Sequence, residues 1–135
     1  MVNNLDVKTK KSHYYQFDSI HNHKYGLLYN WREASSICPE GWHLPSKKEF
    51  ETLLNYYDAQ YLSFIKNDGF NGKLGGYGYY YGDKFGNISL QGYYWTSTTI
   101  NGNGAWCIKL EEKTKSVKLV DFPQDMEFSV RCIKN

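Results

Sequence analysis

Long hydrophobic runs are missing from this 135-residue chain, and so are clusters of arginine. No apolar stretch approaches the roughly 18 residues that a membrane-spanning helix requires. Arg32 and Arg131 are the only arginines, and the other charges are spread along the chain to a net charge of +2. Nucleic-acid binding usually needs a basic stripe. The sequence therefore predicts neither a membrane span nor a nucleic-acid partner.

Cysteine is also scarce, and its spacing excludes the common thiol sites. The three cysteines form no CxxC pair and no zinc-finger or zinc-ribbon pattern. His21 and His23 have no acids or thiols near them in sequence, which favours a polar loop over a metal site. We therefore expect no metal and no cofactor. Residues 1–6 lack the charged-then-apolar pattern of an export signal, so we expect a chain made without one or trimmed of one.

Aromatic residues, in contrast, make up 18% of the chain and include 13 Tyr and 4 Trp. These side chains combine a large apolar area with a polar group, so they suit half-exposed sheets and binding faces. The length fits one domain with a single core. We therefore treat residues 1–135 as one domain, in which residues 1–24 form a polar N-terminal arm with short extended pieces over 5–8 and 13–17.

A first helix is indicated by an apolar stripe at helical spacing. The stripe consists of Leu27, Trp31, Ala34 and Cys38, at steps of four, three and four. Pro39 follows at once and is expected to end this helix, with Cys38 in its last turn.

A second helix has a clearer start. Ser46 and Glu49 have the spacing of a capping box, and residues 50–57 continue with an apolar helical face. A short third helical piece is expected over residues 61–65.

From Gly69 onward, glycines divide the chain into short strands and loops. Strands are predicted over residues 77–81, 93–98, 105–110, 116–120 and 128–133, and the NGNG sequence at 101–104 predicts a hairpin. Helices that precede a run of antiparallel strands favour an α+β fold over a wound parallel sheet.

The alternation of side chains along the strands, together with the helical stripe, predicts the environment of each cysteine. Cys132 shares the apolar face of its strand with Phe128 and Val130, and Cys38 lies on the apolar helical stripe. Cys107 faces away from Trp106, Ile108 and Leu110. The pattern therefore predicts a Cys38–Cys132 disulfide and a free thiol at Cys107. Two buried thiols in a reducing compartment are the alternative.

Arg131 lies on the opposite face of the last strand from Cys132. We expect it to pair with an acid near the termini.

Several sequence blocks stand in an order that resembles a known family. They read NLDV at 4–7, KYGLLYNW at 24–31, CPEGWHLPS at 38–46, GFN at 69–71, GGY at 75–77, GYYWTST at 92–98 and FSVRC at 128–132. The set resembles the Fibrobacter succinogenes major paralogous domain (FISUMP-type), found in surface proteins and lipoproteins of Bacteroidetes and Fibrobacteres. The first strand usual in that family is short or missing here.

That family is related to the C-type-lectin-like fold. The resemblance therefore implies two N-terminal helices on a small twisted antiparallel sheet, long loops and termini close together. It also implies a disulfide from the first helix to the last strand, which agrees with the pairing from the pattern.

The expected function is non-catalytic recognition or adhesion, with a glycan or a protein surface outside the cell as the ligand. An alternative is a structural or receptor-binding component of a phage virion that infects Bacteroidetes. The chain would then be a virion protein if it is complete, and an extracellular or cell-surface protein if a signal was removed. A further alternative is an enzyme resembling the formylglycine-generating enzymes, but no second thiol lies near Cys107 in sequence.

Ligand contacts are expected from the Gly/Tyr-rich stretch 75–86 and its neighbour Asn87, because Tyr and Gly together make adaptable binding loops. Tyr79, Tyr80, Asp83 and Asn87 are the candidates; alternatively, the tyrosines at 77, 79 and 81 only pack a strand. Calcium-dependent lectins bring several acids together. Asp121 and residues 123–125 lack the order of such a loop, so no calcium site is predicted.

Overall fold

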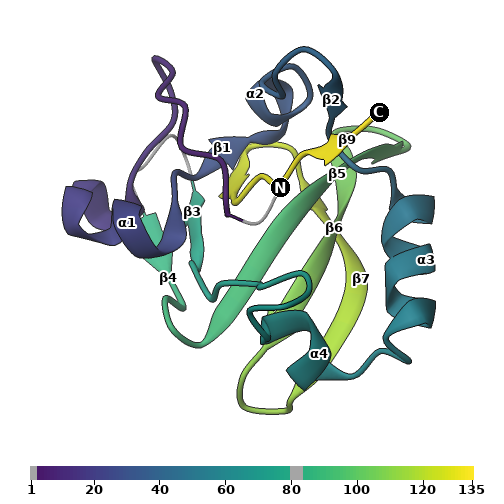
Figure 1. Cartoon of the computed structure of the whole chain (residues 1–135). Coiled ribbons are helices and arrows are strands. Elements are labelled where there is room, and N and C mark those ends of the chain that lie inside the picture. The colour runs from purple at the N-terminus through teal and green to yellow at the C-terminus, as the bar shows by residue number, and fades with distance from the viewer. Residues whose placement is uncertain (1–2, 80–83) are drawn as a thin grey trace.

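A three-stranded antiparallel sheet separates a helical layer from a second sheet in the computed structural model, which describes residues 3–79 and 84–135 (Figure 1). In chain order the elements are η1 (Tyr15–Phe17), η2 (Ser19–His21), α1 (Asn22–Tyr25), β1 (Tyr29–Asn30), α2 (Trp31–Ala34), β2 (Trp42–His43), α3 (Lys47–Tyr56), α4 (Tyr61–Ile65), β3 (Tyr77–Tyr79), β4 (Lys84–Gly86), β5 (Gln91–Ile100), β6 (Gly104–Glu111), β7 (Ser116–Pro123), β8 (Met126–Phe128) and β9 (Ile133–Lys134). The predicted α+β class is confirmed, with more strand than helix.

The central sheet has the strand order β5-β6-β7. The predicted hairpin joins β5 to β6 through residues 101–103, where Gly102 has a φ of +86°, a left-handed conformation that glycine adopts at low cost. Strand β7 pairs with the whole of β6, from Gly104 opposite Pro123 to Glu111 opposite Ser116. The second sheet has the order β1-β8-β3-β4, and β2 pairs with β9 separately.

An apolar core covers each face of the central sheet, and successive residues of β6 point alternately into one core and the other. Ile108 and Leu110 pack under α3 and α4 with Phe50, Phe64 and Tyr94. Ala105 and Cys107 face the other way, into a core with a larger membership: Leu5, Leu27, Tyr29, Ala34, Leu44, Tyr93, Trp95, Phe128, Val130 and Cys132. The prediction that Cys107 faces away from Ile108 and Leu110 is confirmed, and its face is buried as well.

Helix α3 begins where its sequence signal predicted. The Ser46 hydroxyl accepts a hydrogen bond from the backbone N–H of Glu49 at 3.2 Å, and the Glu49 carboxylate accepts one from the Ser46 N–H at 2.7 Å. This capping box satisfies N–H groups that have no partner inside the helix. The third helical piece is α4, over the predicted residues.

The first helix, predicted on the stripe from Leu27 to Cys38, is much shorter in the structure. Only the four residues of α2 are helical, because Leu27 and Leu28 are extended and bond to Leu5 and His13 through their backbones. After α2, the hydroxyl of Ser35 donates to the carbonyl of Arg32, which competes with continuation of the helix. Cys38 therefore lies in a loop and not in a helical turn.

The predicted C-terminal strand over residues 128–133 is split between two sheets. Its first residue ends β8, its last begins β9, and residues 129–132 run between them. There Val130 accepts a hydrogen bond from the Leu5 N–H at 2.8 Å, and Ser129 bridges to Tyr94 of β5. The segment thus joins the N-terminal arm to the central sheet, and Leu5 near the start of the chain lies beside Val130 near its end.

The predicted disulfide between Cys38 and Cys132 is present, with a Cα–Cα distance of 5.8 Å. Cys107 is a free, buried thiol, as predicted. The expectation that Arg131 pairs with an acid is wrong: its Nη2 donates to the side-chain oxygen of Asn4 and to the backbone oxygen of Asn71. Its guanidinium packs against the rings of Phe70 and Tyr94, and no carboxylate of the described residues forms an ion pair with it.

The N-terminal arm is mostly irregular. The extended pieces predicted over residues 5–8 and 13–17 form no strand; His13 makes a single bridge to Leu28, and residues 15–17 form η1. The arm is held by individual bonds, such as the hydroxyl of Tyr29 to the carbonyl of Val7 at 2.8 Å. None of the helices in the described residues is long and apolar enough to cross a membrane.

Candidate functional site

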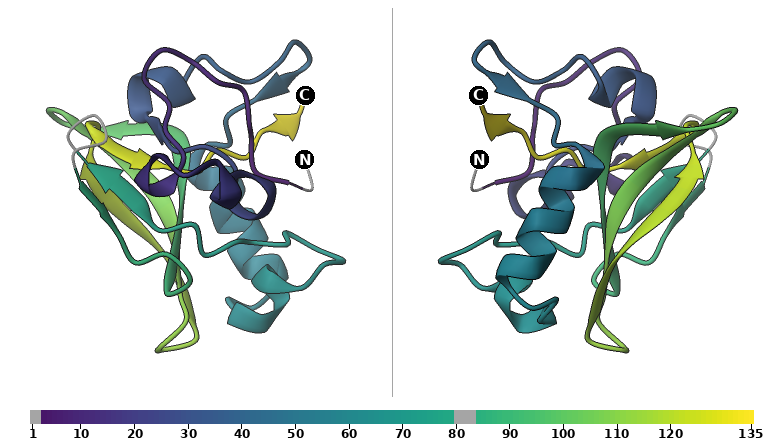
Figure 2. Two further views of the ribbon diagram at one scale, coloured as in Figure 1. Left: turned by 90° about the vertical axis from the view of Figure 1, so that its left-hand side faces the viewer. Right: turned by 90° about the vertical axis from the view of Figure 1, so that its right-hand side faces the viewer.

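A polar cleft of about 590 Å³ lies where α2, the end of β3 and two turns of the C-terminal half meet. We call it the polar cleft; its lining consists of Lys11, Asn30, Arg32, Glu33, Ser36, Tyr79, Asn103, Pro123, Gln124 and Asp125. Figure 2 shows α2, the β5–β6 turn and β8 gathered at this end of the molecule. The volume is in the range of small-molecule sites.

One wall of the cleft is fixed by the cap of α2. The side-chain oxygen of Asn30 accepts a hydrogen bond from the N–H of Glu33 at 3.1 Å, and the Asn30 amide donates to the Glu33 carboxylate at 3.2 Å. The other carboxylate oxygen of Glu33 accepts from the hydroxyl of Thr9 at 2.5 Å. Both side chains are therefore held in one position before any ligand arrives, which lowers the entropic cost of binding.

The opposite wall is the turn between β7 and β8. Gln124 donates from its backbone N–H to Asn103 at 2.8 Å and from its side-chain amide to Gly104 at 3.1 Å. Its carbonyl accepts from the N–H of Trp31, the first residue of α2, at 3.0 Å. Gln124 thus ties the two turns and the helix together around the cleft.

Asp125, next to Gln124, has an unsatisfied carboxylate oxygen. Its Oδ1 is buried and accepts no hydrogen bond from the described residues. Buried polar atoms almost always have a partner, because leaving one unpaired costs about 1–3 kcal/mol. The residue as a whole is half-buried and lines the cleft, so Asp125 is the carboxylate that a hydroxyl or N–H donor of a ligand would meet there.

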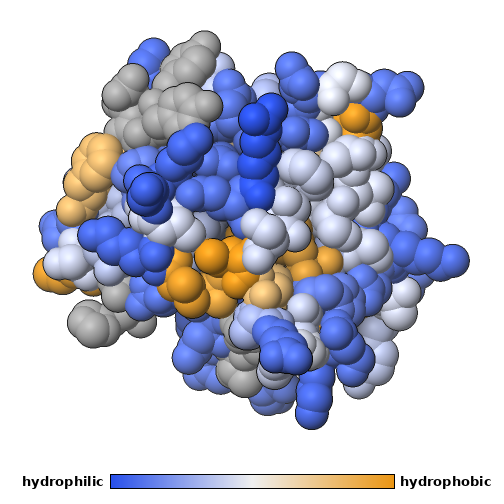
Figure 3. All heavy atoms as spheres, turned by 90° about the horizontal axis from the view of Figure 1, so that it is seen from above, coloured by the Kyte–Doolittle hydropathy of each residue, from blue (hydrophilic) through white to orange (hydrophobic). Residues whose placement is uncertain are grey.

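The cleft carries charges of both signs. Lys11 and Arg32 are exposed cations, whereas Glu33 and Asp125 supply carboxylates and Tyr79 supplies an aromatic ring. Helix α2, which contributes Arg32, belongs to a mainly hydrophilic face with one central group of apolar side chains (Figure 3). Mixed donors and acceptors beside a ring can bind a neutral ligand with many hydroxyl groups.

Tyr79 and Asn87, the two predicted ligand contacts that the structure describes, lie in different places. Tyr79 lines the polar cleft, but Asn87 follows β4 at the opposite end of the β3–β4 hairpin, where its side-chain amide donates to Gln91 at 2.6 Å. Tyr80 and Asp83 lie outside the described residues, as does Tyr81. The structure thus keeps Tyr79 as a candidate and places Asn87 elsewhere.

Metal ligands do not converge in the described part of the chain. Within it there is no group of three or more His, Cys, Asp and Glu side chains that could hold an ion. Asp121 is an exposed residue of β7, opposite Trp106 of β6. The side chains of His21 and His23 are not among those described.

The surroundings of the buried Cys107 thiol disfavour its ionisation. Burial, helped by the nearby charge of Asp121, raises the pKa of this thiol far above its ordinary value, which disfavours the nucleophilic thiolate. A histidine could act as an activating base, but His43 bonds to Asn135 at 2.6 Å and to Glu49 at 2.9 Å, one with each ring nitrogen. The arrangement does not make Cys107 a nucleophile.

Most of the cleft was missed from the sequence. Asn30 and Glu33 have the spacing of a helix cap, which could have placed the start of α2 at Trp31. Asn103 is part of the predicted hairpin turn, but its closeness to Gln124 and α2 depends on long-range pairing, for which a single sequence contains no signal.

The family model of the Fibrobacter succinogenes major domain matches residues 2–134. No curated protein sequence and no solved structure gives a significant match. Because the family model covers nearly the whole chain, including the loops and turns that form the polar cleft, the chain belongs to the Fibrobacter succinogenes major domain family.

Proposed function

We propose that this domain is a non-catalytic recognition module that binds a glycan in the polar cleft. The observation that carries the proposal is the half-buried carboxylate residue Asp125 in the lining of a cleft whose other walls are fixed by hydrogen bonds. A sugar hydroxyl would donate to Asp125, and a sugar face would lie against the ring of Tyr79. Fixed polar groups of this kind give orientation and specificity.

A surface location and a C-type-lectin-like relationship are part of this proposal. The Cys38–Cys132 disulfide supports the first, because disulfides persist mainly in oxidising compartments. The second is supported by the position of that bridge, from the loop after α2 to the C-terminal segment, and by a small sheet with long irregular connections.

A glycan array of the purified domain, followed by calorimetry on the best glycan, tests the proposal. We expect Asp125→Asn to weaken binding about tenfold or more, because it removes a charged acceptor. Asp121→Asn is the matched control, since Asp121 is an exposed acid outside the cleft. Tyr79→Ala should also weaken binding.

Binding should persist in a calcium chelator, since no acid cluster among the described residues could hold the ion. An array without any bound glycan contradicts the proposal. Equal losses for Asp125→Asn and Asp121→Asn would also contradict it, because the cleft would then not be the binding site.

A further inference from the structure

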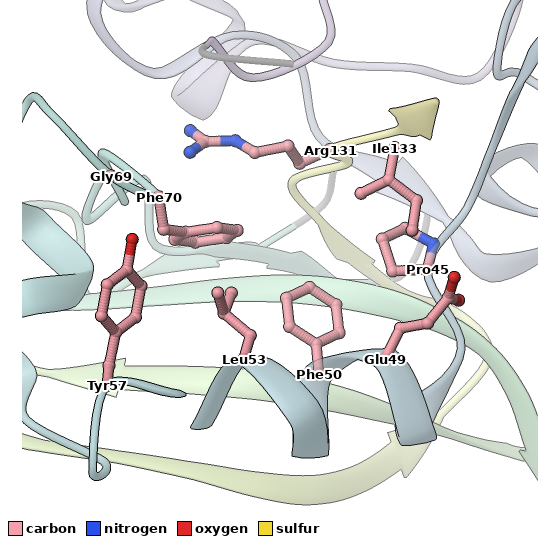
Figure 4. Close-up of a pocket in the computed structure, with 9 residues that line it drawn as sticks. All are labelled: Pro45, Glu49, Phe50, Leu53, Tyr57, Gly69, Phe70, Arg131 and Ile133. Atoms are coloured by element: carbon pink, nitrogen blue, oxygen red, sulfur yellow. The ribbon is translucent and has the colours of Figure 1, made fainter. Parts of the chain in front are cut away.

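Arg131 and Glu127 are both buried, but they are enclosed in different ways. Only 2% of Arg131 is exposed, and its guanidinium carbon lies 4.4 Å from the centre of the Phe70 ring and 5.2 Å from that of Tyr94. Figure 4 shows this guanidinium over Phe70, beside the apolar side chains that α3 contributes to a neighbouring pocket. Arg131 is thus enclosed by rings that belong to the core. Glu127 is covered instead by a side chain of the N-terminal arm.

The carboxylate of Glu127 depends on this one side chain. Glu127 lies in β8, between β1 and β3, opposite Asn30 and Gly78, and its side chain is 0% exposed. A Cβ at position 78 would lie only 2.6 Å from Oε2, so the glycine there makes room for the carboxylate. Both carboxylate oxygens contact Nδ1 of His13, at 3.0 and 3.2 Å, and no other hydrogen bond to them is found among residues 3–79 and 84–135.

His13 is the outer member of this pair, with 17% of its side chain exposed. Its backbone N–H and carbonyl bond to Leu28 at 3.1 and 2.8 Å. After it, Gln16 and Phe17 have φ values of +53° and +57°, in the left-handed region that is unfavourable for a side chain as bulky as phenylalanine. Of the three residues in η1, Tyr15 alone is buried, and Phe17 is 62% exposed. Few contacts and a strained backbone are typical of a segment that can open locally.

The charges around the pair favour one shared proton. Besides His13, the charge that acts on Glu127 is that of Glu33 in α2, whereas Asn30 and Gly78, from β1 and β3, carry none. Protonated His13 with ionised Glu127, and neutral His13 with protonated Glu127, both leave the pair without net charge. Loss of the shared proton leaves a net negative charge beside Glu33, in a place that excludes solvent, which is unfavourable.

We propose that His13 and Glu127 form a pH-dependent latch that holds residues 9–17 of the arm on the four-stranded sheet. While the two side chains share one proton, the segment stays closed. When it opens, both side chains meet water, where an imidazole releases its proton above about pH 6.5. The closed segment therefore holds the proton more tightly than the open one, and rising pH favours opening.

Opening of the latch changes the polar cleft as well. Lys11 lines the cleft, and the hydroxyl of Thr9 donates to Glu33 in its wall at 2.5 Å, so both contacts belong to the segment that opens. The start of the arm stays in place through a separate bond, from the N–H of Leu5 to the carbonyl of Val130 at 2.8 Å. The latch thus controls one wall of the cleft, whatever ligand the cleft binds.

Amide hydrogen exchange measured by NMR tests the latch, because the amides of His13 and Leu28 form the two backbone bonds that close the segment. Their protection factors should be at least about tenfold lower than that of Ile108 in the central sheet, which shows opening without global unfolding. They should also fall at least about fivefold between about pH 5.5 and pH 8.

Two variants assign this pH dependence to the pair. In Glu127→Gln, and in the uncharged His13→Gln/Glu127→Gln, the protection of the Leu28 amide should no longer fall as the pH rises. His43→Gln is the matched control, because it removes a histidine–glutamate pair that is exposed, with Glu49, and the fall should persist there.

Three results would overturn the latch. The first is a Leu28 amide as well protected as that of Ile108, since the segment would then open only when the whole domain unfolds. The second is a wild-type protection factor that does not fall with pH, and the third is an unchanged fall in the variants without Glu127.

Discussion

Cys107, Glu127 and Arg131 are ionisable side chains that are fully or almost fully buried. The surroundings accommodate each of these three side chains in a different way. Burial keeps Cys107 as a thiol, Glu127 contacts His13 at 3.0 Å, and Arg131 lies between two rings and two asparagines. Because unpaired buried charge is costly, the residues around these groups are as constrained as the groups themselves.

The burial of Glu127 leads to a prediction about how the stability of the fold depends on pH. It is 0% exposed, and burial raises the pKa of its carboxyl, although His13 opposes the shift. A raised pKa means that the folded state holds this proton more tightly than the unfolded state. The carboxyl's contribution to stability is therefore fully present below its ordinary pKa of 4.5 and is lost as the pH rises through the higher folded value.

Glu127→Gln removes this titration. We expect the variant to gain stability relative to wild type as the pH is raised from 4 towards 8, and urea unfolding at several pH values measures the difference. A difference that stays constant or falls over this range would show that the folded carboxyl does not hold its proton more tightly.

Helices α2 and α3 show how a local helix signal can agree or conflict with the strand pairing that the tertiary structure requires. Helix α3 has a capping box at Ser46 and an apolar face that covers the central sheet, so both levels agree. Helix α2 has a good cap at Asn30 but only one turn, because the residues before it are needed for backbone pairing. An apolar stripe at helical spacing was thus misleading where strand pairing used the same residues.

The capping box of α3 makes a prediction about stability. Ser46→Ala removes the acceptor of the Glu49 N–H and should lower the free energy of unfolding by about 1 kcal/mol. Thr52→Ala, at an exposed position of the same helix, is the control. It should cost nothing or stabilise slightly, because alanine is the better helix former. Urea unfolding compares the two, and equal stability of Ser46→Ala and wild type would show that the cap is not needed.

Over the whole molecule, stability depends on fastening the two ends to the central sheet. Val130 accepts a hydrogen bond from Leu5, and Cys132 is bonded to Cys38. The four-stranded sheet itself combines segments from distant parts of the chain, since β8 lies between β1 and β3. Loss of the C-terminal segment would therefore affect both sheets and the N-terminal arm together.

The Cys38–Cys132 disulfide leads to a prediction about the stability of the whole molecule. It closes a loop with a sequence separation of 94, for which the chain-entropy model gives about 4–5 kcal/mol. The Cys38→Ala/Cys132→Ala variant should lose up to this amount in urea unfolding, and dithiothreitol should destabilise wild type but not the variant. Denatured, unreduced protein should show one free thiol, from Cys107; three would contradict the bridge.

The sequence by itself determined the features that depend on local spacing. These are the capping box of α3, the range of α4, the 101–104 hairpin and the face on which Cys107 lies. Each follows from helical or strand periodicity or from a turn residue, and such signals act over a few positions. The Cys38–Cys132 pairing was also predicted correctly, although Cys38 lies in a loop and not on the helical stripe used for that prediction. Of the predicted ligand contacts that the structure describes, Tyr79 lines the cleft and Asn87 does not.

Only the tertiary structure decided what lies opposite each of these elements. It shortened the first helix, divided the C-terminal strand between two sheets, and put Arg131 against Phe70 and Tyr94 instead of an acid. It also brought Asn30, Gln124 and Asp125 into one cleft. The physical reason is that both faces of the central sheet are buried, so the role of a residue depends on which distant segment covers it. Local periodicity does not specify that segment.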